Sequence, residues 1–114
     1  MRKTISHRAM KVASEIKKVL SGLLLLDDDL RGVTITEVDV SPNLRFTKVY
    51  FVCGDLNVDD VMMLFDIRLK YLQKDLAEKI NLKYATTLQF IYDKAFEHAD
   101  KITKILDEIS HERD

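Results

Sequence analysis

The feature that most constrains the fold is a stretch of 23 residues, 58–80, in which apolar side chains recur every three or four positions. This spacing places them on one stripe of an α-helix, so one face must be buried while the others stay in water. Asn57 or Asp59 can cap its start. A chain of 114 residues is therefore expected to fold as one small domain, residues 1–114, around this helix. The stripe consists of Val58, Val61, Phe65, Leu69, Leu72, Leu76 and Ile80.

Two further helices and three strands are predicted around it. Residues 5–25 and 94–111 repeat the helical spacing, the second at Ala95, Ala99, Ile102, Leu106 and Ile109. Residues 33–40, 44–53 and 84–92 have the β-branched and aromatic composition of strands. Ser41-Pro42-Asn43 is a turn signal, so the first two strands are expected to pair antiparallel. The order α-β-β-α-β-α predicts a two-layer α+β domain with a three-stranded sheet.

The first strand carries a phase change in its apolar pattern. Val33 and Ile35 point to one face, whereas Val38 and Val40 are out of phase with them. One extra residue near Thr36-Glu37 would restore the register, so a β-bulge is predicted there.

Charge is distributed unevenly along the chain. The formal net charge is −1, yet residues 1–20 hold six basic residues and one acid. This asymmetry indicates either an acidic partner at the basic end or a solvated helix face. The candidate phosphate contacts are Arg8, Lys11 and Lys18 in the first helix, Arg45 and Lys48 in the second strand, and Arg68, Lys70, Lys74, Lys79 and Lys83 in and after the long helix.

Sequence motifs for catalysis or cofactors are missing, so an enzyme is not expected. Each glycine is isolated, and the three histidines lie in three separate places outside any metal-binding motif. Asp27-Asp28-Asp29 is interpreted as a solvated loop rather than a metal site. The single cysteine, Cys53, is read as a small buried residue, and a lone cysteine favours a reducing compartment, the cytosol. The longest apolar run, Leu23 to Leu26, is far shorter than a membrane span.

Four pieces of the chain together resemble the ribosome-binding factor A family (RbfA). They are Arg8-Ala9-Met10-Lys11-Val12-Ala13; Thr34 to Leu44 followed by Lys48-Val49-Tyr50; Leu88-Gln89-Phe90-Ile91-Tyr92-Asp93; and Ile102 to Leu106. The resemblance implies a type II KH-like fold, α-β-β-α(-α)-β, plus a C-terminal helix. It implies a non-catalytic, cytoplasmic ribosome assembly factor. Such a factor binds the free small ribosomal subunit and its rRNA and assists late maturation and rRNA processing. A monomer without cofactor or metal is expected, and RNA binding of the ordinary KH kind is not, because a Gly-x-x-Gly loop is missing.

The sequence also departs from the family pattern. Arg68-Leu69-Lys70 stands where the family has small residues at a kink, which predicts a straighter long helix here. Gln73 replaces an Arg, Thr86 replaces a Pro, and Asp27-Asp28-Asp29-Leu30 replaces Asp-Pro-Arg-Leu.

An alternative class is a small α+β protein–protein adaptor or a homodimeric interaction module. The position of the basic residues in space discriminates between the two. A continuous positive surface favours RNA, whereas a large exposed apolar patch favours a protein partner.

Overall fold

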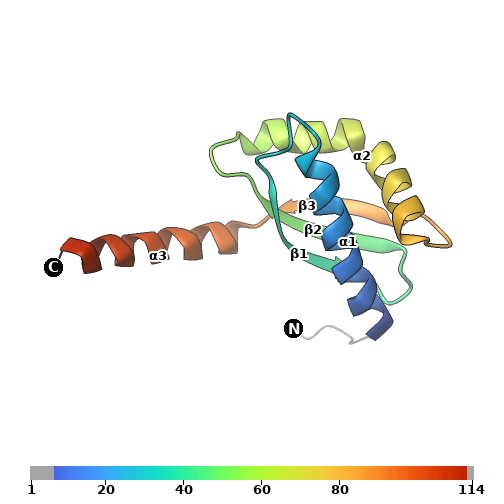
Figure 1. Cartoon of the computed structure of the whole chain (residues 1–114), viewed down its shortest axis with the longest axis horizontal. Helices are drawn as coiled ribbons and strands as arrows, with labels where there is room; N and C mark the ends of the chain where they lie inside the picture. The colour runs from blue at the N-terminus through green and yellow to red at the C-terminus, as the bar shows by residue number, and fades with distance from the viewer. Residues whose placement is uncertain (1–6, 113–114) are drawn as a thin grey trace.

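The computed structural model describes the backbone of residues 7–112 and the side chains of residues 7–107. The elements are α1 (His7–Leu25), β1 (Thr34–Val40), β2 (Phe46–Val52), α2 (Val58–Ile80), β3 (Thr87–Tyr92) and α3 (Lys94–Glu112) (Figure 1). The sheet order is β1-β2-β3, with β1 antiparallel and β3 parallel to β2. The predicted order, the α+β class and the three-stranded sheet are confirmed. The expected helix start at residue 5 lies outside the described residues.

Two helices cover one face of the sheet, which makes the two layers. Ile16, Leu20 and Leu24 of α1 are buried, as the apolar spacing predicts. Along β2, Thr47, Val49 and Phe51 are buried, while Phe46 and Lys48, which alternate with them, are exposed. Alternate side chains of a strand point to opposite faces. One face of the sheet therefore packs under α1 and α2 (Figure 1), and the other face carries exposed side chains.

Stacked aromatic rings join α2 to the sheet. Phe65 of α2 stacks on Phe90 of β3 with ring centroids 3.8 Å apart. Phe51 of β2 meets the Phe65 ring edge-on at 5.1 Å. Asn57 caps α2 by accepting a hydrogen bond from the Asp60 backbone N–H, in agreement with one of the two predicted caps.

The predicted bulge in β1 is present, and it positions a side chain that contacts the start of α3. The register shifts between Ile35 and Glu37, so Thr36 is the extra residue. The Thr36 hydroxyl donates a 2.6 Å hydrogen bond to Asp93, which also accepts from the backbone N–H of Phe96 and so caps α3. The bulge therefore ties the edge strand to the start of the last helix.

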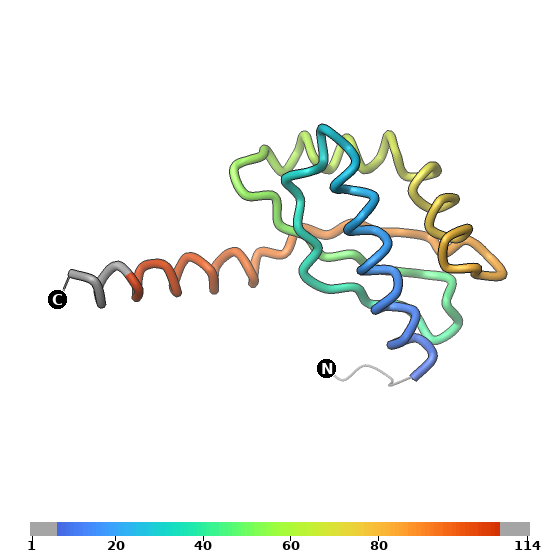
Figure 2. The backbone as a smooth tube through the Cα atoms, in the orientation of Figure 1, coloured from blue at the N-terminus to red at the C-terminus, as the bar shows by residue number. Residues whose placement is uncertain are grey.

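Two sequence predictions about these elements are wrong. The third strand begins at Thr87 rather than at residue 84, so residues 84–86 belong to the preceding loop. The long helix is continuous over 58–80, yet it is not straight: its axis changes direction about halfway along (Figures 1 and 2). Its two halves have different partners, because Phe65 packs on the sheet while Gln73 bonds the start of β3. Packing thus overrides the absence of small residues.

Each departure from the family pattern has a partner in the fold. Arg68 forms ion pairs with Asp27 at 3.1 Å and with Asp29 at 2.8 Å, so the two altered segments meet each other. Gln73 accepts a 2.9 Å hydrogen bond from the Leu88 backbone N–H. The Thr86 and Thr47 hydroxyls form a buried hydrogen bond of 2.7 Å.

The last helix projects away from the domain (Figure 2). The stripe at Ala95, Ala99, Ile102 and Leu106 exists, but all four residues are exposed. The side chain of the fifth stripe residue, Ile109, lies outside the described ones.

Candidate nucleic-acid interface

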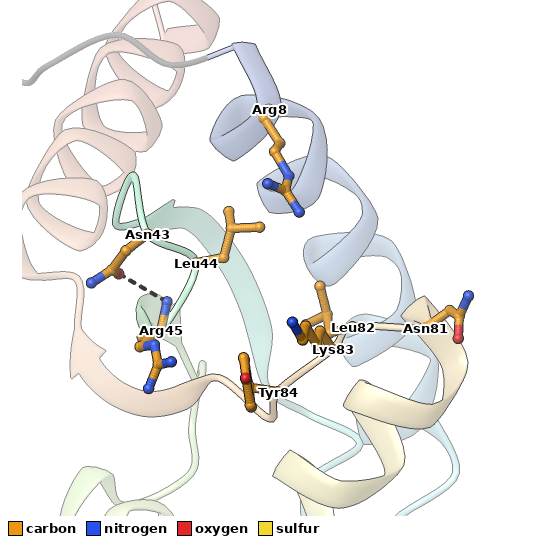
Figure 3. A pocket seen from close by; sticks show the side chains of 8 residues that line it. All are labelled: Arg8, Asn43, Leu44, Arg45, Asn81, Leu82, Lys83 and Tyr84. Carbon is orange, nitrogen blue, oxygen red and sulfur yellow. Dashed lines mark hydrogen bonds between the residues drawn. The ribbon is translucent and has the colours of Figure 1, made fainter.

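A pocket of about 270 Å³ lies at the end of the domain where β2 and β3 begin. Three cationic side chains converge there from distant parts of the chain: Arg8 from α1, Arg45 from the loop before β2, and Lys83 from the loop after α2 (Figure 3). We call this site the basic pocket. Its lining residues are Arg8, Asn43, Leu44, Arg45, Asn81, Leu82, Lys83 and Tyr84.

One wall of the basic pocket is a tightly held turn. Asn43 Oδ1 accepts hydrogen bonds from the Ser41 hydroxyl at 2.6 Å and from the Arg45 backbone N–H at 3.0 Å (Figure 3). Leu44 has φ 63°, the left-handed region, which costs a non-glycine residue about 1–2 kcal/mol. The backbone N–H of Leu44 bonds the Ser41 carbonyl at 2.8 Å. The turn that presents Arg45 is thus rigid before any ligand arrives.

The opposite wall is the end of α2 and the loop that follows. Asn81 ends the helix with φ 60°, and its backbone N–H bonds the Ala77 carbonyl. This left-handed cap turns the chain so that Lys83 and Tyr84 lie beside Arg45. The Arg45 guanidinium carbon lies 4.6 Å from the centre of the Tyr84 ring, and Lys83 Nζ lies 5.5 Å from it. Tyr84 therefore stabilises two neighbouring cations through its ring face.

The electrostatics of the basic pocket suit an anion. Among the described residues, its lining combines three cations with amide and hydroxyl groups and contains no carboxylate. Arg8 also lies in the first turn of α1, a turn without acidic residues, where the helix dipole is positive. Arg and Lys at such positions form charge-assisted hydrogen bonds with phosphate oxygens.

The ten predicted site residues do not form one patch. Arg8, Arg45 and Lys83 meet in the basic pocket, and Lys11 follows Arg8 one turn later on α1 and is exposed. Lys18 and Lys79 instead lie beside an apolar groove of about 710 Å³ between α1 and the end of α2. Lys70 and Lys74 are exposed on α2.

Two of the ten have surroundings that the sequence did not reveal. Arg68 is held by Asp27 and Asp29 and is 27% exposed, so its charge is already compensated. The predicted solvated Asp loop is therefore partly an ion-pair partner. Lys48 lies on the exposed sheet face, away from the helices.

Sequence reasoning missed Tyr84, Asn43 and Asn81 as parts of the site. Strand propensity places Tyr84 in the third strand, and the Ser41-Pro42-Asn43 signal identifies Asn43 only as a turn residue. One signal was available: Asn directly after a helical stripe is typical of a left-handed helix end, which predicts that the chain turns at Asn81.

The perturbed titratable groups lie at the other end of the domain, near the start of α3. Burial and the nearby Glu97 raise the pKa of the Cys53 thiol. A hydrogen bond with Glu97 raises the pKa of Tyr92 to about 12. Hydrogen bonds from Thr36 and the Phe96 backbone lower the pKa of Asp93. The shifts of Tyr92 and Asp93 follow from hydrogen bonds at the start of α3, whereas that of Cys53 follows first from burial.

Metal binding and membrane insertion are considered for the described residues, 7–112. Among them, three or more His, Cys, Asp or Glu side chains do not gather anywhere in a way that could hold a metal ion. Within residues 7–112, the helices lack the combination of length and apolar content that crossing a bilayer requires.

Comparison with known proteins gives a consistent result. The family model described as "Ribosome-binding factor A" matches residues 8–106. A ribosome-binding factor A of Novosphingobium aromaticivorans is 35% identical, covering 97% of this chain and 87% of that protein. One from Francisella philomiragia is 35% identical over 80% of this chain and 66% of its own length.

Solved structures share the fold. The crystal structure of ribosome-binding factor A from Thermus thermophilus has a TM-score of 0.67 at 17% identity, covering 74% of this chain and 94% of that one. A Thermus thermophilus homology model of the same factor, fitted into an electron-microscopy map of a 30S complex, has a TM-score of 0.59 at 16% identity. It covers 80% of this chain and 97% of that one.

Proposed function

Because the chain belongs to the ribosome-binding factor A family, we propose that it binds the small ribosomal subunit through rRNA, with the basic pocket as its central contact. The observation that carries this proposal is the convergence of Arg8, Arg45 and Lys83 around a pocket to which the described part of the chain contributes no carboxylate. Phosphate contacts from such cations supply salt-dependent affinity, and they position a protein on RNA.

The shape of the basic pocket suits an RNA backbone better than a buried small ligand. The pocket opens on the domain end, and its cations come from a helix start and two loops, so they can follow successive phosphates. Arg45 is pre-stacked on Tyr84 and its turn is rigid, so little side-chain freedom is lost on binding. Lys11 extends the basic row along α1.

The biological role follows from the family. The chain is proposed to act in the cytoplasm during late small-subunit maturation and rRNA processing, as a binding factor without catalytic activity. Lys18 and Lys79 beside the apolar groove, and Lys70 and Lys74 on α2, remain proposed contacts outside the basic pocket, and Lys48 is a proposed contact on the other sheet face. Arg68 is proposed to position the Asp27–Asp29 loop.

The test compares two triple variants in sedimentation with purified small subunits across a salt series. Arg8→Ala/Arg45→Ala/Lys83→Ala removes the three converging cations. Its matched control, Arg31→Ala/Lys94→Ala/Lys101→Ala, removes the same charge from exposed positions elsewhere. The pocket variant is expected to lose binding and to lower the slope of log affinity against log salt by about two to three, whereas the control keeps most of the affinity.

Equal binding and equal salt slopes in the two variants would show that the basic pocket is not the docking site.

A second readout tests the role in maturation: cells with the pocket variant as sole copy are expected to accumulate unprocessed small-subunit rRNA. Circular dichroism verifies that both variants are folded.

The alternative role, a protein–protein adaptor, has one observation in its favour. The apolar groove between α1 and α2 is lined by Val19, Leu23 and Ile80, with the exposed Leu25 and Leu26 at its edge. Subunit binding that survives high salt and loss of the pocket cations would favour this role.

A further inference from the structure

The helix α3 carries an apolar face that nothing in the described chain covers. Every residue from His98 to Asp107 is exposed. Phe96 is 48%, Ile102 45%, Ile105 55% and Leu106 59% exposed. The contacts that fasten α3 to the domain involve its start: Asp93 caps it, and Glu97 binds Tyr92. The rest of the helix extends from the domain (Figure 1).

On α3 the charged and the apolar residues occupy different positions of a seven-residue repeat. Ala95, Ala99, Ile102 and Leu106 follow the 4-3-4 spacing of the a and d positions of a coiled coil. The flanking e and g positions hold uncharged or apolar residues, namely Phe96, His98, Thr103 and Ile105. All charged residues of 94–107 fall on the b, c and f positions, and these are Lys94, Glu97, Asp100, Lys101, Lys104 and Asp107.

From this pattern we propose that the free protein self-associates by pairing α3 with α3 of a second copy. Two such faces can meet without burying a charge, and a seam of period 3.5 fits another seam of the same kind. The charged side chains need no partner from outside, because Lys101 pairs with Glu97 at 3.3 Å and Lys104 with Asp100 at 3.2 Å.

Other classes of partner fit the helix less well. Its charged face holds three cations and three anions over residues 94–107. Nucleic acid and anionic lipid surfaces select helices with an excess of Lys and Arg. Over the whole helix, residues 94–112, three Lys stand against five Asp and Glu, so neither surface suits it, whereas the uncharged e and g positions of 94–107 suit a second copy of the same seam.

The size of the face predicts a weak, reversible dimer. A helix of 19 residues is about 28 Å long, and its seam gives roughly 300 Å² per partner, well below the ~800 Å² of a stable interface. Association is therefore expected to be detectable only at high protein concentration. The pairing leaves the basic pocket open, because β2 and β3 are parallel and α3 leaves from the strand ends opposite that pocket.

The test is sedimentation equilibrium of the full chain between about 10 µM and 1 mM. Ile102→Glu/Leu106→Glu places two charges in the seam and is expected to raise the dissociation constant at least ~100-fold. Lys104→Glu changes the net charge by the same amount on the solvent face and is the matched control, with an expected change under about threefold. Ala99→Leu enlarges the seam and is expected to tighten the dimer about tenfold.

A parent protein that stays monomeric at 1 mM, together with an Ala99→Leu variant that also stays monomeric, overturns the proposal. If the Ile102→Glu/Leu106→Glu variant dimerises as tightly as the parent, the interface lies elsewhere, for instance in the groove between α1 and α2. That result also overturns the proposal. Small-subunit binding by the seam variant is expected to match the parent, so this result is independent of the proposed ribosome contact.

Discussion

The contact of Arg68 with the Asp loop gives the sharpest test of how this chain stabilises its fold. Arg68→Ala removes a guanidinium that is 27% exposed and leaves Asp27, 22% exposed, without its partner. The contact with Asp27 at 3.1 Å is an ion pair without a hydrogen bond, and breaking a pair of largely buried charges costs several times the roughly 0.2–0.5 kcal/mol of an exposed pair such as that with Asp29, to which Arg68 Nη2 donates at 2.8 Å. We expect a loss of about 2 kcal/mol in the free energy of unfolding, or roughly 6–10 °C in Tm.

A double-mutant cycle in urea unfolding separates the pair energies from the rest. Arg68 with Asp27 should show a coupling of about 1 kcal/mol, and Arg68 with the 62% exposed Asp29 less than about 0.5 kcal/mol. Lys70→Ala, an exposed neighbour on the same helix, should change stability by less than about 0.5 kcal/mol. Strict additivity of Arg68→Ala with both Asp variants would refute the reasoning, because the two altered segments would then be independent.

Three further predictions concern local contacts, and each is measured by urea unfolding. Thr86→Val should lower the free energy of unfolding by about 1–2 kcal/mol because it leaves the buried Thr47 hydroxyl unpaired. The double variant Thr47→Val/Thr86→Val should recover most of that loss. An equal loss in the single and the double variant would contradict the pairing. Gly22→Ala should stabilise the protein by about 0.5–1 kcal/mol, since a Cβ there meets nothing within 4 Å and Ala favours a helix; a loss would mean that the glycine conformation is needed. The pKa of Asp93 is lowered from its ordinary 3.8, so the stability that its charged form provides is present above about pH 4 and is lost as the pH falls through the lowered pKa. Asp93→Asn should flatten the dependence of the unfolding free energy on pH below about pH 4. An unchanged dependence would argue against the contact with Thr36.

Much of the local structure could be predicted because its cause is local. The apolar spacing over 58–80 gives the buried Val61, Phe65 and Leu72, and the phase change in the first strand gives the bulge at Thr36. The strand boundary at Thr87 could not be found, because Tyr84 has strand propensity yet pairs with Arg45 instead. Propensity reports what a residue tolerates, whereas a tertiary neighbour decides which state it adopts.

The sequence predicts which residues could belong to the candidate site, but not which of them lie together. Basic positions can be read from a sequence, yet their ability to bind phosphate depends on which side chains lie within a few ångströms. Arg8, Arg45 and Lys83 are separated by dozens of residues and meet because the left-handed Leu44 and Asn81 turn two loops toward the start of α1. Arg68 looked equivalent to them, but two carboxylates from another loop compensate its charge.

Local patterns thus specify the elements, their order and the buried stripes, because period and propensity act over a few neighbouring residues, and the ordered motifs indicate the family. Four features emerge only when the layers assemble: β3 runs parallel to β2, α2 bends, α3 projects with its apolar face open, and particular cations converge. These features depend on contacts between segments far apart in the chain. Their free energies come from packing and charge pairs that exist only once the layers have assembled.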